Sequence, residues 1–449
     1  MQRARHRFPS GFVFGAATSA YQVEGAVTAD GRGESIWDRF CAQPGAVRAG
    51  DSGEEACDFY HRFPQDVELM RELGIDAFRF SIAWPRVLPE GRGRVEQRGL
   101  DFYDRLVDAL LEAGIRPFAT LYHWDLPQRL EDEGGWPERA TAEAFVEYVE
   151  TVAERLGDRV ADWTTHNEPF CSAWLGYASG AHAPGRSSVA DGIAAAHHIL
   201  LSHGWAVEAL RRTCPGSSVG IVLDCWPVHP ASDDPADVEA CRRVDALRNR
   251  LYFDAVFRGA YPEEALEQVA PAAPPIRDGD LAAISRPLDF VGVNNYSRML
   301  VRAGADGVPV EVRAPQGRLT EMGWEVVPDA LHEVLTRIHR EYRAQRIYVT
   351  ENGAAFYDVR LHDGRVHDPE RIDYLDRHLA AVARAIEAGV PVAGYFVWSL
   401  LDNFEWAHGY AKRFGLVYVD YPTQQRVPKD SFYWYRDLLT GRRAAATPV

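Results

Sequence analysis

Short apolar runs alternate with longer amphipathic stretches along most of the chain. The runs, rich in aromatic and β-branched residues, predict eight strands: Phe12–Gly15, Ala77–Ser81, Arg116–Leu121, Asp162–Asn167, Ser218–Leu223, Asp289–Asn294, Ile347–Glu351 and Val392–Trp398. The stretches carry apolar residues three and four positions apart and predict helices: Pro64–Leu73, Leu100–Ala113, Thr141–Leu156, Val189–Arg212, Val238–Phe257, Asp329–Tyr342 and Arg371–Ala388. A strand followed by a helix is therefore the repeating unit.

Three of the predicted helices end at the same kind of junction. Gly74, Gly114 and Gly389 each precede an apolar residue, where the chain must turn left-handed before re-entering a sheet. No Pro-, Ser- or Gly-rich linker and no shift in composition divides the chain. The pattern predicts an α/β fold, a single (β/α)8 barrel domain over residues 1–449, with an active site at the C-terminal ends of its strands. An open, doubly wound parallel sheet is the alternative.

Composition and charge narrow the possible partners. The chain has 449 residues, 46% of them hydrophobic, which is enough for a large core. Its 65 acidic and 49 basic residues give a net charge of −16, the wrong sign for nucleic acid or an anionic membrane surface. Because the N-terminal stretch lacks the apolar core of a secretory leader, we expect the cytoplasm. The six scattered cysteines are expected to be free thiols.

Two glutamates far apart in the sequence close predicted strands. Glu168 follows strand four before a proline, and Glu351 ends strand seven ahead of Asn-Gly. In a barrel these strands could place both side chains across one pocket. Two facing carboxylates are what glycosidic cleavage requires, because one protonates the departing oxygen and the other attacks the anomeric carbon or activates water. Taken singly, each glutamate is more simply interpreted as a surface or salt-bridged residue.

Several longer segments carry a resemblance to a known family. They are Ala17–Gly25, Arg79–Arg86, Tyr122–Pro127, Asn167–Pro169, Thr350–Gly353 and Trp398–Trp406. With these segments in order and nearly end to end, the chain resembles glycoside hydrolase family 1, the β-glucosidase family. The resemblance implies that Glu168 is the general acid/base and Glu351 the nucleophile of a retaining mechanism. Arg79 would keep Glu351 ionised, and Tyr296 would touch the nucleophile and the ring oxygen.

The retaining mechanism sets two expectations for the carboxyl pair. Their separation should be roughly 5 Å. An apolar pocket should raise the pKa of Glu168, while the neighbouring cation should keep Glu351 charged.

The resemblance also implies a set of sugar-binding residues. They are Gln22, His123, Trp124, Asn167, Asn294, Trp324, Trp398, Glu405, Trp406 and Phe414. Trp398 would stack beneath the sugar ring, and Trp324 or Trp174 would line the aglycone side unless they only pack. The irregular stretch Met299–Glu321 is expected to form an entrance loop. The charge of Glu405, despite the nearby Lys412 and Arg413, argues against a phosphorylated glycoside.

One position departs from the family pattern. His166 stands before Asn167 where family members usually carry an apolar or aromatic residue. Because side chains alternate along a strand, His166 should point away from the pocket that Asn167 enters, and we expect it to affect packing. The histidines show no metal-ligand spacing with carboxylates, so we predict neither a metal nor a cofactor.

The resulting hypothesis is a retaining exo-β-glycosidase, a β-glucosidase that hydrolyses terminal non-reducing β-D-glucosyl residues. The expected substrates are small β-glucosides such as cellobiose and aryl glucosides, in keeping with a role in cellulose degradation. β-Galactosidase or β-fucosidase activity and transglycosylation at the same site remain alternatives. A non-hydrolytic sugar-binding barrel is another, and the oligomeric state stays open.

Overall fold

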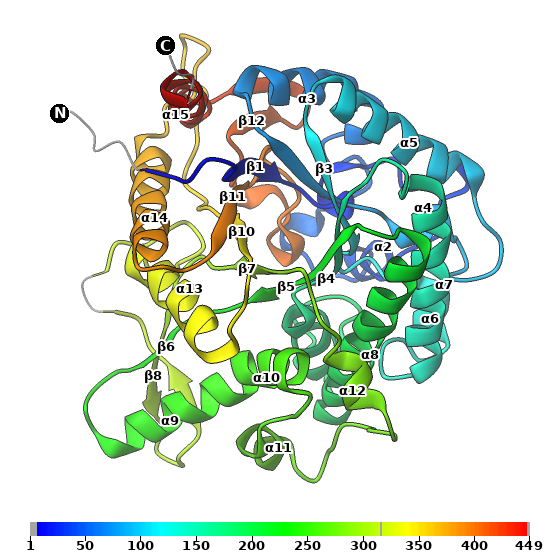
Figure 1. Cartoon of the computed structure of the whole chain (residues 1–449), viewed down its shortest axis with the longest axis vertical. Helices are drawn as coiled ribbons and strands as arrows, with labels where there is room; N and C mark the ends of the chain where they lie inside the picture. The colour runs from blue at the N-terminus through cyan, green and yellow to red at the C-terminus, as the bar shows by residue number, and fades with distance from the viewer. Residues whose placement is uncertain (1–6, 315–316, 447–449) are drawn as a thin grey trace.

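Eight parallel strands close into a barrel in the computed structural model, which describes residues 7–314 and 317–446 (Figure 1). Around the barrel the order is β1-β11-β10-β7-β5-β4-β3-β2. The strands are β1 (Val13–Ala17), β2 (Ala77–Ser81), β3 (Arg116–Tyr122), β4 (Asp162–Asn167), β5 (Ser218–Asp224), β7 (Phe290–Asn294), β10 (Ile347–Asn352) and β11 (Val392–Trp398). All eight predicted strands are confirmed, and closure excludes the open sheet.

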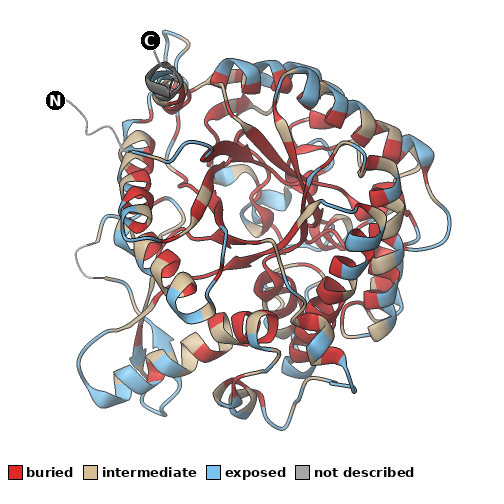
Figure 2. Cartoon of the chain, in the orientation of Figure 1, coloured by how far each residue is buried: buried red, intermediate tan, exposed pale blue. Residues whose placement is uncertain are grey.

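Helices surround the barrel, and their apolar faces pack on the outside of the strands. The principal ones are α3 (Phe59–Leu73), α5 (Gln97–Glu112), α7 (Arg139–Leu156), α8 (Val189–Thr213), α13 (Pro328–Tyr342), α14 (Pro369–Glu387) and α15 (Asp430–Ala446). Figure 2 shows the barrel strands buried and most of the surrounding helices divided into a buried and an exposed side. Gly74, Gly114 and Gly389 all have φ between 72° and 90°, as the three helix–strand junctions predict.

The predicted helix Val238–Phe257 is not a regular α-helix. It runs through α9 (Pro235–Asp245), a π-helical turn η4 (Ala246–Arg250) and α10 (Leu251–Arg258). A π-helical turn shifts the phase of the apolar face by inserting a residue, which hydrophobic spacing alone does not disclose.

The stretch Met299–Glu321 was expected to be irregular, and that expectation is wrong for its first half. β8 (Met299–Ala303) and β9 (Pro309–Glu311) form an antiparallel pair, and β8 also pairs with β6 (Val228–Pro230). These strands are short and half-exposed, so they lack the apolar run that marks a barrel strand. A second hairpin joins β12 (Val417–Asp420) to β13 (Gln425–Pro428).

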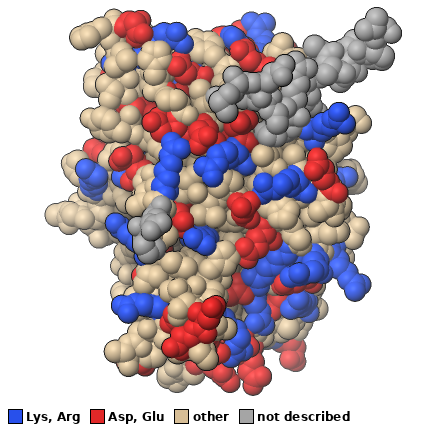
Figure 3. Space-filling model, turned by 90° about the vertical axis from the view of Figure 1, so that its left-hand side faces the viewer, with Lys and Arg blue, Asp and Glu red and all other residues tan. Residues whose placement is uncertain are grey.

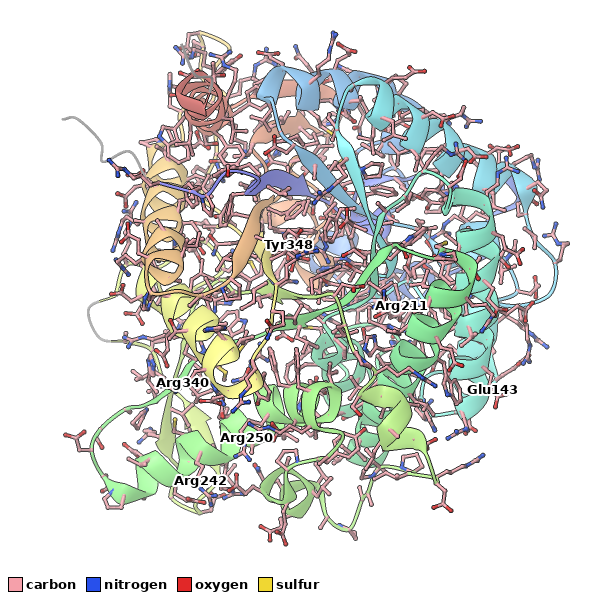
Figure 4. All side chains as sticks on the ribbon, viewed as in Figure 1. Glu143, Arg211, Arg242, Arg250, Arg340 and Tyr348 are labelled. Carbon is pink, nitrogen blue, oxygen red and sulfur yellow. The ribbon has the colours of Figure 1, made fainter. Side chains whose placement is uncertain are left out.

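Aromatic side chains fill the interior of the barrel below the strand ends. Phe118, Phe290, Tyr348 and Phe396 contact one another with ring centroids 5.2–6.4 Å apart. In Figure 4, Tyr348 lies near the centre of the barrel, whereas the labelled arginines and glutamate belong to the outer helices. Because this layer fills the barrel interior, the space for a pocket lies above it, at the C-terminal ends of the strands.

Acidic and basic side chains are interspersed on the face in Figure 3. Among the helices of residues 7–314 and 317–446, none has the length and apolar character needed to cross a bilayer.

Candidate active site

A pocket of 380 Å³ lies at the C-terminal ends of the strands, and both candidate glutamates line it. Glu168 follows β4, and Glu351 lies near the end of β10. Both residues are more than nine-tenths buried. The barrel therefore brings the two candidate residues to one pocket, as the sequence predicts.

Two neighbours hold the carboxylate of Glu351. Arg79 on β2 donates from Nη1 to Oε1 at 2.6 Å, and the Tyr296 hydroxyl donates to Oε2 at 2.6 Å. Burial raises the pKa of Glu351, and the Arg79 guanidinium and the Tyr296 hydroxyl act in the opposite direction. Arg79 also donates from Nη2 to Asn167 Oδ1 at 2.6 Å, so one guanidinium links the two glutamate-bearing strands.

The carboxylate of Glu168 has no basic partner at hydrogen-bonding distance among the described residues. It accepts from Asn294 Nδ2 at 2.6 Å and from the Cys171 thiol at 3.1 Å. Burial raises the pKa of Glu168 well above its ordinary value, and the negative charges of Asp224 and Glu351 add to this effect. The surroundings of Glu168 thus favour its protonated form, while Glu351 faces a cation.

Both strands that carry the glutamates change register just before them. The pairing of β4 with β5 shifts between Thr164 and Asn167, and that of β10 with β7 shifts between Val349 and Glu351. Such bulges re-aim side chains. If side chains alternated strictly along each strand, Asn167 and Glu351 would point to the outside of the barrel. The register shifts turn both side chains to the inner face.

Left-handed backbone conformations also gather at the pocket. Glu168, Trp124 and Trp406 have φ of 50°, 79° and 49°. Each such residue costs on the order of 1–3 kcal/mol and persists only where its surroundings fix it. The backbone at these positions is therefore constrained to aim its side chains at the pocket.

The predicted sugar-binding residues fall into two groups. One group lines the pocket: His123, Trp124, Trp324, Trp398, Glu405, Trp406 and Phe414. The other is fully buried and bonded to neighbouring side chains or backbone: Gln22, Asn167 and Asn294. Gln22 donates both amide hydrogens to the Asn403 side chain and the Phe404 carbonyl. Its remaining capacity toward a sugar is one lone pair of Oε1, since the Ser19 hydroxyl donates to the other.

Of the predicted sugar-binding residues that line the pocket, two have a buried polar atom with no hydrogen-bond partner among the described residues. These atoms are His123 Nδ1 and Glu405 Oε2. Burial and the charge of Glu351 raise the pKa of Glu405 to about 8, and burial and Arg79 lower the pKa of His123 well below its ordinary value. A buried unpaired polar atom is costly, so a ligand hydroxyl that pairs with it gains binding energy.

Aromatic rings form the walls of the pocket. Trp398 stacks with His123 at a centroid distance of 5.9 Å, and Trp124 packs on Trp406 at 4.6 Å. At the other side, Trp324 contacts Trp226 and Tyr296 at 5.2 and 5.3 Å. Trp174 does not line this pocket; it stacks on Phe170, which does.

His166 points away from the pocket, as expected, but it does so because the register shift in β4 turns it outward and its neighbour Asn167 inward. Its Nε2 bonds the Ser202 hydroxyl on α8 at 2.9 Å, and its ring packs on Phe145 at 4.4 Å. Burial lowers its pKa well below the ordinary value, so it is neutral. His166 contributes to the packing of β4 against the surrounding helices.

The pocket residues that sequence reasoning missed include Asp224, Cys171 and Arg248. Asp224 ends β5, so the same strand-end rule that identified Glu168 could have found it. Cys171 and Arg248 lie in π-helical turns, η3 (Cys171–Ala178) and η4, and no sequence pattern marks them. Ligand-type atoms of Glu168, Cys171 and Asp224 lie within 4.8 Å of one another. Since Cys171 bonds Glu168 and Arg248 pairs with Asp224, we infer no metal site from this trio.

Comparison with known proteins agrees with this geometry. The sequence model described as glycosyl hydrolase family 1 matches residues 4–443. Beta-glucosidase A of Thermotoga maritima is 48% identical over 96% of this chain and 98% of its own. A bifunctional beta-D-glucosidase/beta-D-fucosidase of Bifidobacterium breve is 48% identical over 97% of this chain and 99% of its own. The solved T. maritima beta-glucosidase in complex with glucoimidazole superposes with a TM-score of 0.95, at 48% identity over 97% of this chain and 99% of that one.

Proposed function

Because this chain belongs to glycosyl hydrolase family 1, we propose that it is a β-glucosidase that removes terminal non-reducing β-D-glucosyl residues with retention of configuration. One observation carries the proposal. Two buried carboxyls share a pocket, one bonded to a guanidinium and the other kept from ionising by burial and like charge. That is the division of labour that double displacement requires.

In the first step, a carboxylate oxygen of Glu351 attacks the anomeric carbon. The bond from that carbon to the aglycone oxygen breaks, and the proton of Glu168 moves to the departing oxygen. Arg79 holds the attacking carboxylate in its charged form, and Tyr296 fixes its second oxygen. The products are the free alcohol and a glucosyl ester of Glu351.

In the second step, water replaces the aglycone. Forming the ester removes the negative charge of Glu351, so the pKa of Glu168 falls and its carboxylate can accept a proton from water. The water oxygen attacks the anomeric carbon, and the Glu351 ester bond breaks. Two inversions give net retention, and Glu168 regains its proton.

The pocket supports a monosaccharide at its base and a variable aglycone at its mouth. The indole rings of Trp398 and Trp406 in the pocket wall suit the apolar face of a sugar. The polar atoms of His123 and Glu405 suit its hydroxyl groups. Cellobiose and aryl glucosides are the proposed substrates, and solved relatives from T. maritima are complexes with glucoimidazole and deoxynojirimycin. The bifunctional relative supports β-fucosidase activity as a second activity of this site.

A phosphorylated glycoside fits less well, though not for the reason that the sequence gives. With a pKa of about 8, Glu405 is mostly uncharged near neutrality and repels a phosphate only weakly. The two nearby cations are instead engaged elsewhere. Lys412 contacts the backbone carbonyl of Glu321, and Arg413 pairs with Asp402 at 2.7 Å. A phosphate would have to break these pairs.

A reducing compartment such as the cytoplasm is the proposed place of action. All six cysteines are free, and five of them are buried.

Exchange of the two glutamates tests the proposal. Glu351→Gly is expected to abolish hydrolysis of nitrophenyl β-glucoside, and azide should restore turnover with α-glucosyl azide as the product. Glu168→Gln should lower kcat/KM about 10²–10⁴-fold for alkyl glucosides and far less for dinitrophenyl glucoside. Glu321→Gly is the matched control, because this exposed glutamate adjoins the pocket-lining Met322. Unaltered turnover in either active-site variant would refute the assignment.

A further inference from the structure

A further carboxylate, that of Asp224, faces the pocket beside the candidate acid. Asp224 is the last residue of β5, and along this strand Gly220, Val222 and Asp224 share the inner face. In the barrel register, Asp224 pairs with Asn294, whose amide donates to Glu168. The backbone N–H of Glu168 in turn donates to the Val222 carbonyl at 2.9 Å. β5 therefore fixes both the backbone of Glu168 and the carboxylate next to it.

Arg248 holds the carboxyl group of Asp224 in place and favours its charged form. Arg248 Nη2 donates to Asp224 Oδ2 at 2.7 Å. The Arg248 guanidinium itself lies 4.3 Å from the ring centroid of Phe170 and 5.4 Å from that of Trp226. One carboxylate oxygen of Asp224, one of Glu168 and the Cys171 sulfur lie within 4.8 Å of one another. A carboxyl group paired with an arginine thus lies in the pocket wall at close range to Glu168.

We propose that Asp224, held by Arg248, is a positioning residue that keeps Glu168 protonated in the free enzyme and so sets the upper pH limit of catalysis. The inference rests on the proposed function and deepens it. In a scheme of two carboxyls, Glu351 alone would supply the negative charge that favours the acid form. Here two charges act, and only one of them vanishes when the glucosyl ester forms.

The electrostatics agree with the geometry. After burial, Asp224 is the largest cause of the raised pKa of Glu168, ahead of Glu351. Burial raises the pKa of Asp224, and Arg248 opposes that effect, which favours its carboxylate form. The other titratable or charged groups at the pocket are Cys171, Tyr296, Glu351, Glu405, Glu311, His123, His182, His408 and, through Glu351, Arg79. Cys171 and Tyr296 have pKa values raised well above the ordinary, so both stay neutral near pH 7.

The negative charge of Asp224 disfavours the carboxylate form of Glu168. Removing that charge therefore lowers the pKa of Glu168. Since Glu168 must be protonated to donate to the leaving group, the alkaline limb of kcat/KM moves to lower pH. Loss of the Arg248 cation has the opposite effect, because it raises the proton affinity of the Asp224–Glu168 pair as a whole.

The test is the pH profile of kcat/KM on an alkyl β-glucoside, whose poor leaving group requires the acid. Asp224→Asn keeps the shape of the side chain and removes its charge. We expect its alkaline limb to lie about one pH unit below that of the wild type. Arg248→Met keeps the aliphatic stem and should move the limb upward. Asp245→Asn is the matched control, because it breaks another Asp–Arg pair, with Arg337, near the same π-helical turn.

The proposal is overturned if the alkaline limb of kcat/KM in Asp224→Asn stays at the wild-type pH. It is also overturned if Asp245→Asn shifts that limb as far as Asp224→Asn does. Should Asp224→Asn fail to fold, Arg248→Met decides, and an unmoved limb there overturns the proposal. Failure of the proposed function is distinguishable, because the wild type itself would then show no glucoside hydrolysis.

Discussion

Two glutamates of the same chain acquire different roles from the atoms around their carboxylates. Glu351 faces a guanidinium and a phenol, both of which stabilise the charged form. Glu168 faces an amide, a thiol and negative charge, in a site that burial has stripped of water. Both glutamates are buried, so the difference between nucleophile and acid comes from the polar and charged groups next to each carboxyl group.

Tyr296→Phe tests the hydrogen bond on the nucleophile. The Tyr296 hydroxyl lowers the pKa of Glu351, so its loss raises that pKa. Because Glu351 must be ionised to attack, the acidic limb of kcat/KM on nitrophenyl β-glucoside should move to higher pH. A hydrogen bond to a charged group is worth about 1.5–3 kcal/mol, so kcat/KM at the pH optimum should fall about 10- to 100-fold.

Tyr395→Phe is the control for that measurement. Tyr395 is buried and donates to Asn352 Oδ1 at 2.6 Å, one residue from the nucleophile. Its loss should lower the free energy of unfolding without moving the acidic limb. An acidic limb that responds equally to both substitutions would show that Tyr296 acts through general packing.

At the residue scale, the sequence identified most of what the pocket contains. The motif residues Glu168, Glu351, His123 and Glu405 all line it, because strand ends in a barrel converge. The strand-end rule alone could have indicated Asp224, but no flanking motif distinguishes this aspartate from other strand-end residues. The engagement of Gln22 with Asn403 and Phe404 was not predictable either, because it depends on a contact across 381 residues.

At the scale of elements, regular periodicity was predictable and its interruptions were not. All eight strands follow from apolar runs, whereas the bulges in β4 and β10 come from how neighbouring strands pair. The π-helical turns η3 and η4 likewise leave no mark on the apolar spacing. These interruptions matter because each one positions a pocket residue, as bulges near active sites do.

Gly353→Ala tests how the end of β10 is packed against β11. A Cβ at Gly353 would lie 1.8 Å from the carbonyl oxygen of Trp398, so one of the two strand ends must shift. We expect a loss of about 1–3 kcal/mol in the free energy of unfolding. We also expect a fall in kcat/KM, since Trp398 forms that contact and Glu351 lies close to it in the chain. Thermal unfolding and nitrophenyl glucoside kinetics measure both.

Gly389→Ala separates the two effects. Gly389 follows α14 with φ of 90°, and nothing lies within 4 Å of the position that an added Cβ would occupy. Its substitution should cost about 1 kcal/mol of stability through backbone strain and leave kcat/KM unchanged. Equal losses of activity in the two variants would contradict a specific role for the Gly353–Trp398 contact.

At the scale of the whole molecule, closure of the barrel turns distant segments into one site. The aromatic layer of Phe118, Phe290, Tyr348 and Phe396 blocks one end, and the strand ends open at the other. The net charge of −16 argues against polyanions as partners but says nothing of sugars. Fold, pocket position and the raised pKa of Glu168 were thus predictable, while the contribution of Asp224 to that pKa needed three-dimensional neighbours.

The most direct measurement is to trap the covalent intermediate. Incubation with 2,4-dinitrophenyl 2-deoxy-2-fluoro-β-glucoside, followed by mass spectrometry of the intact chain and its peptides, locates the attacking residue. We predict a single fluoroglucosyl group on each chain, attached to Glu351 and released slowly as the protein regains activity. A label on any other residue, or continued turnover of natural glucosides with no adduct formed, would contradict this assignment of the nucleophile.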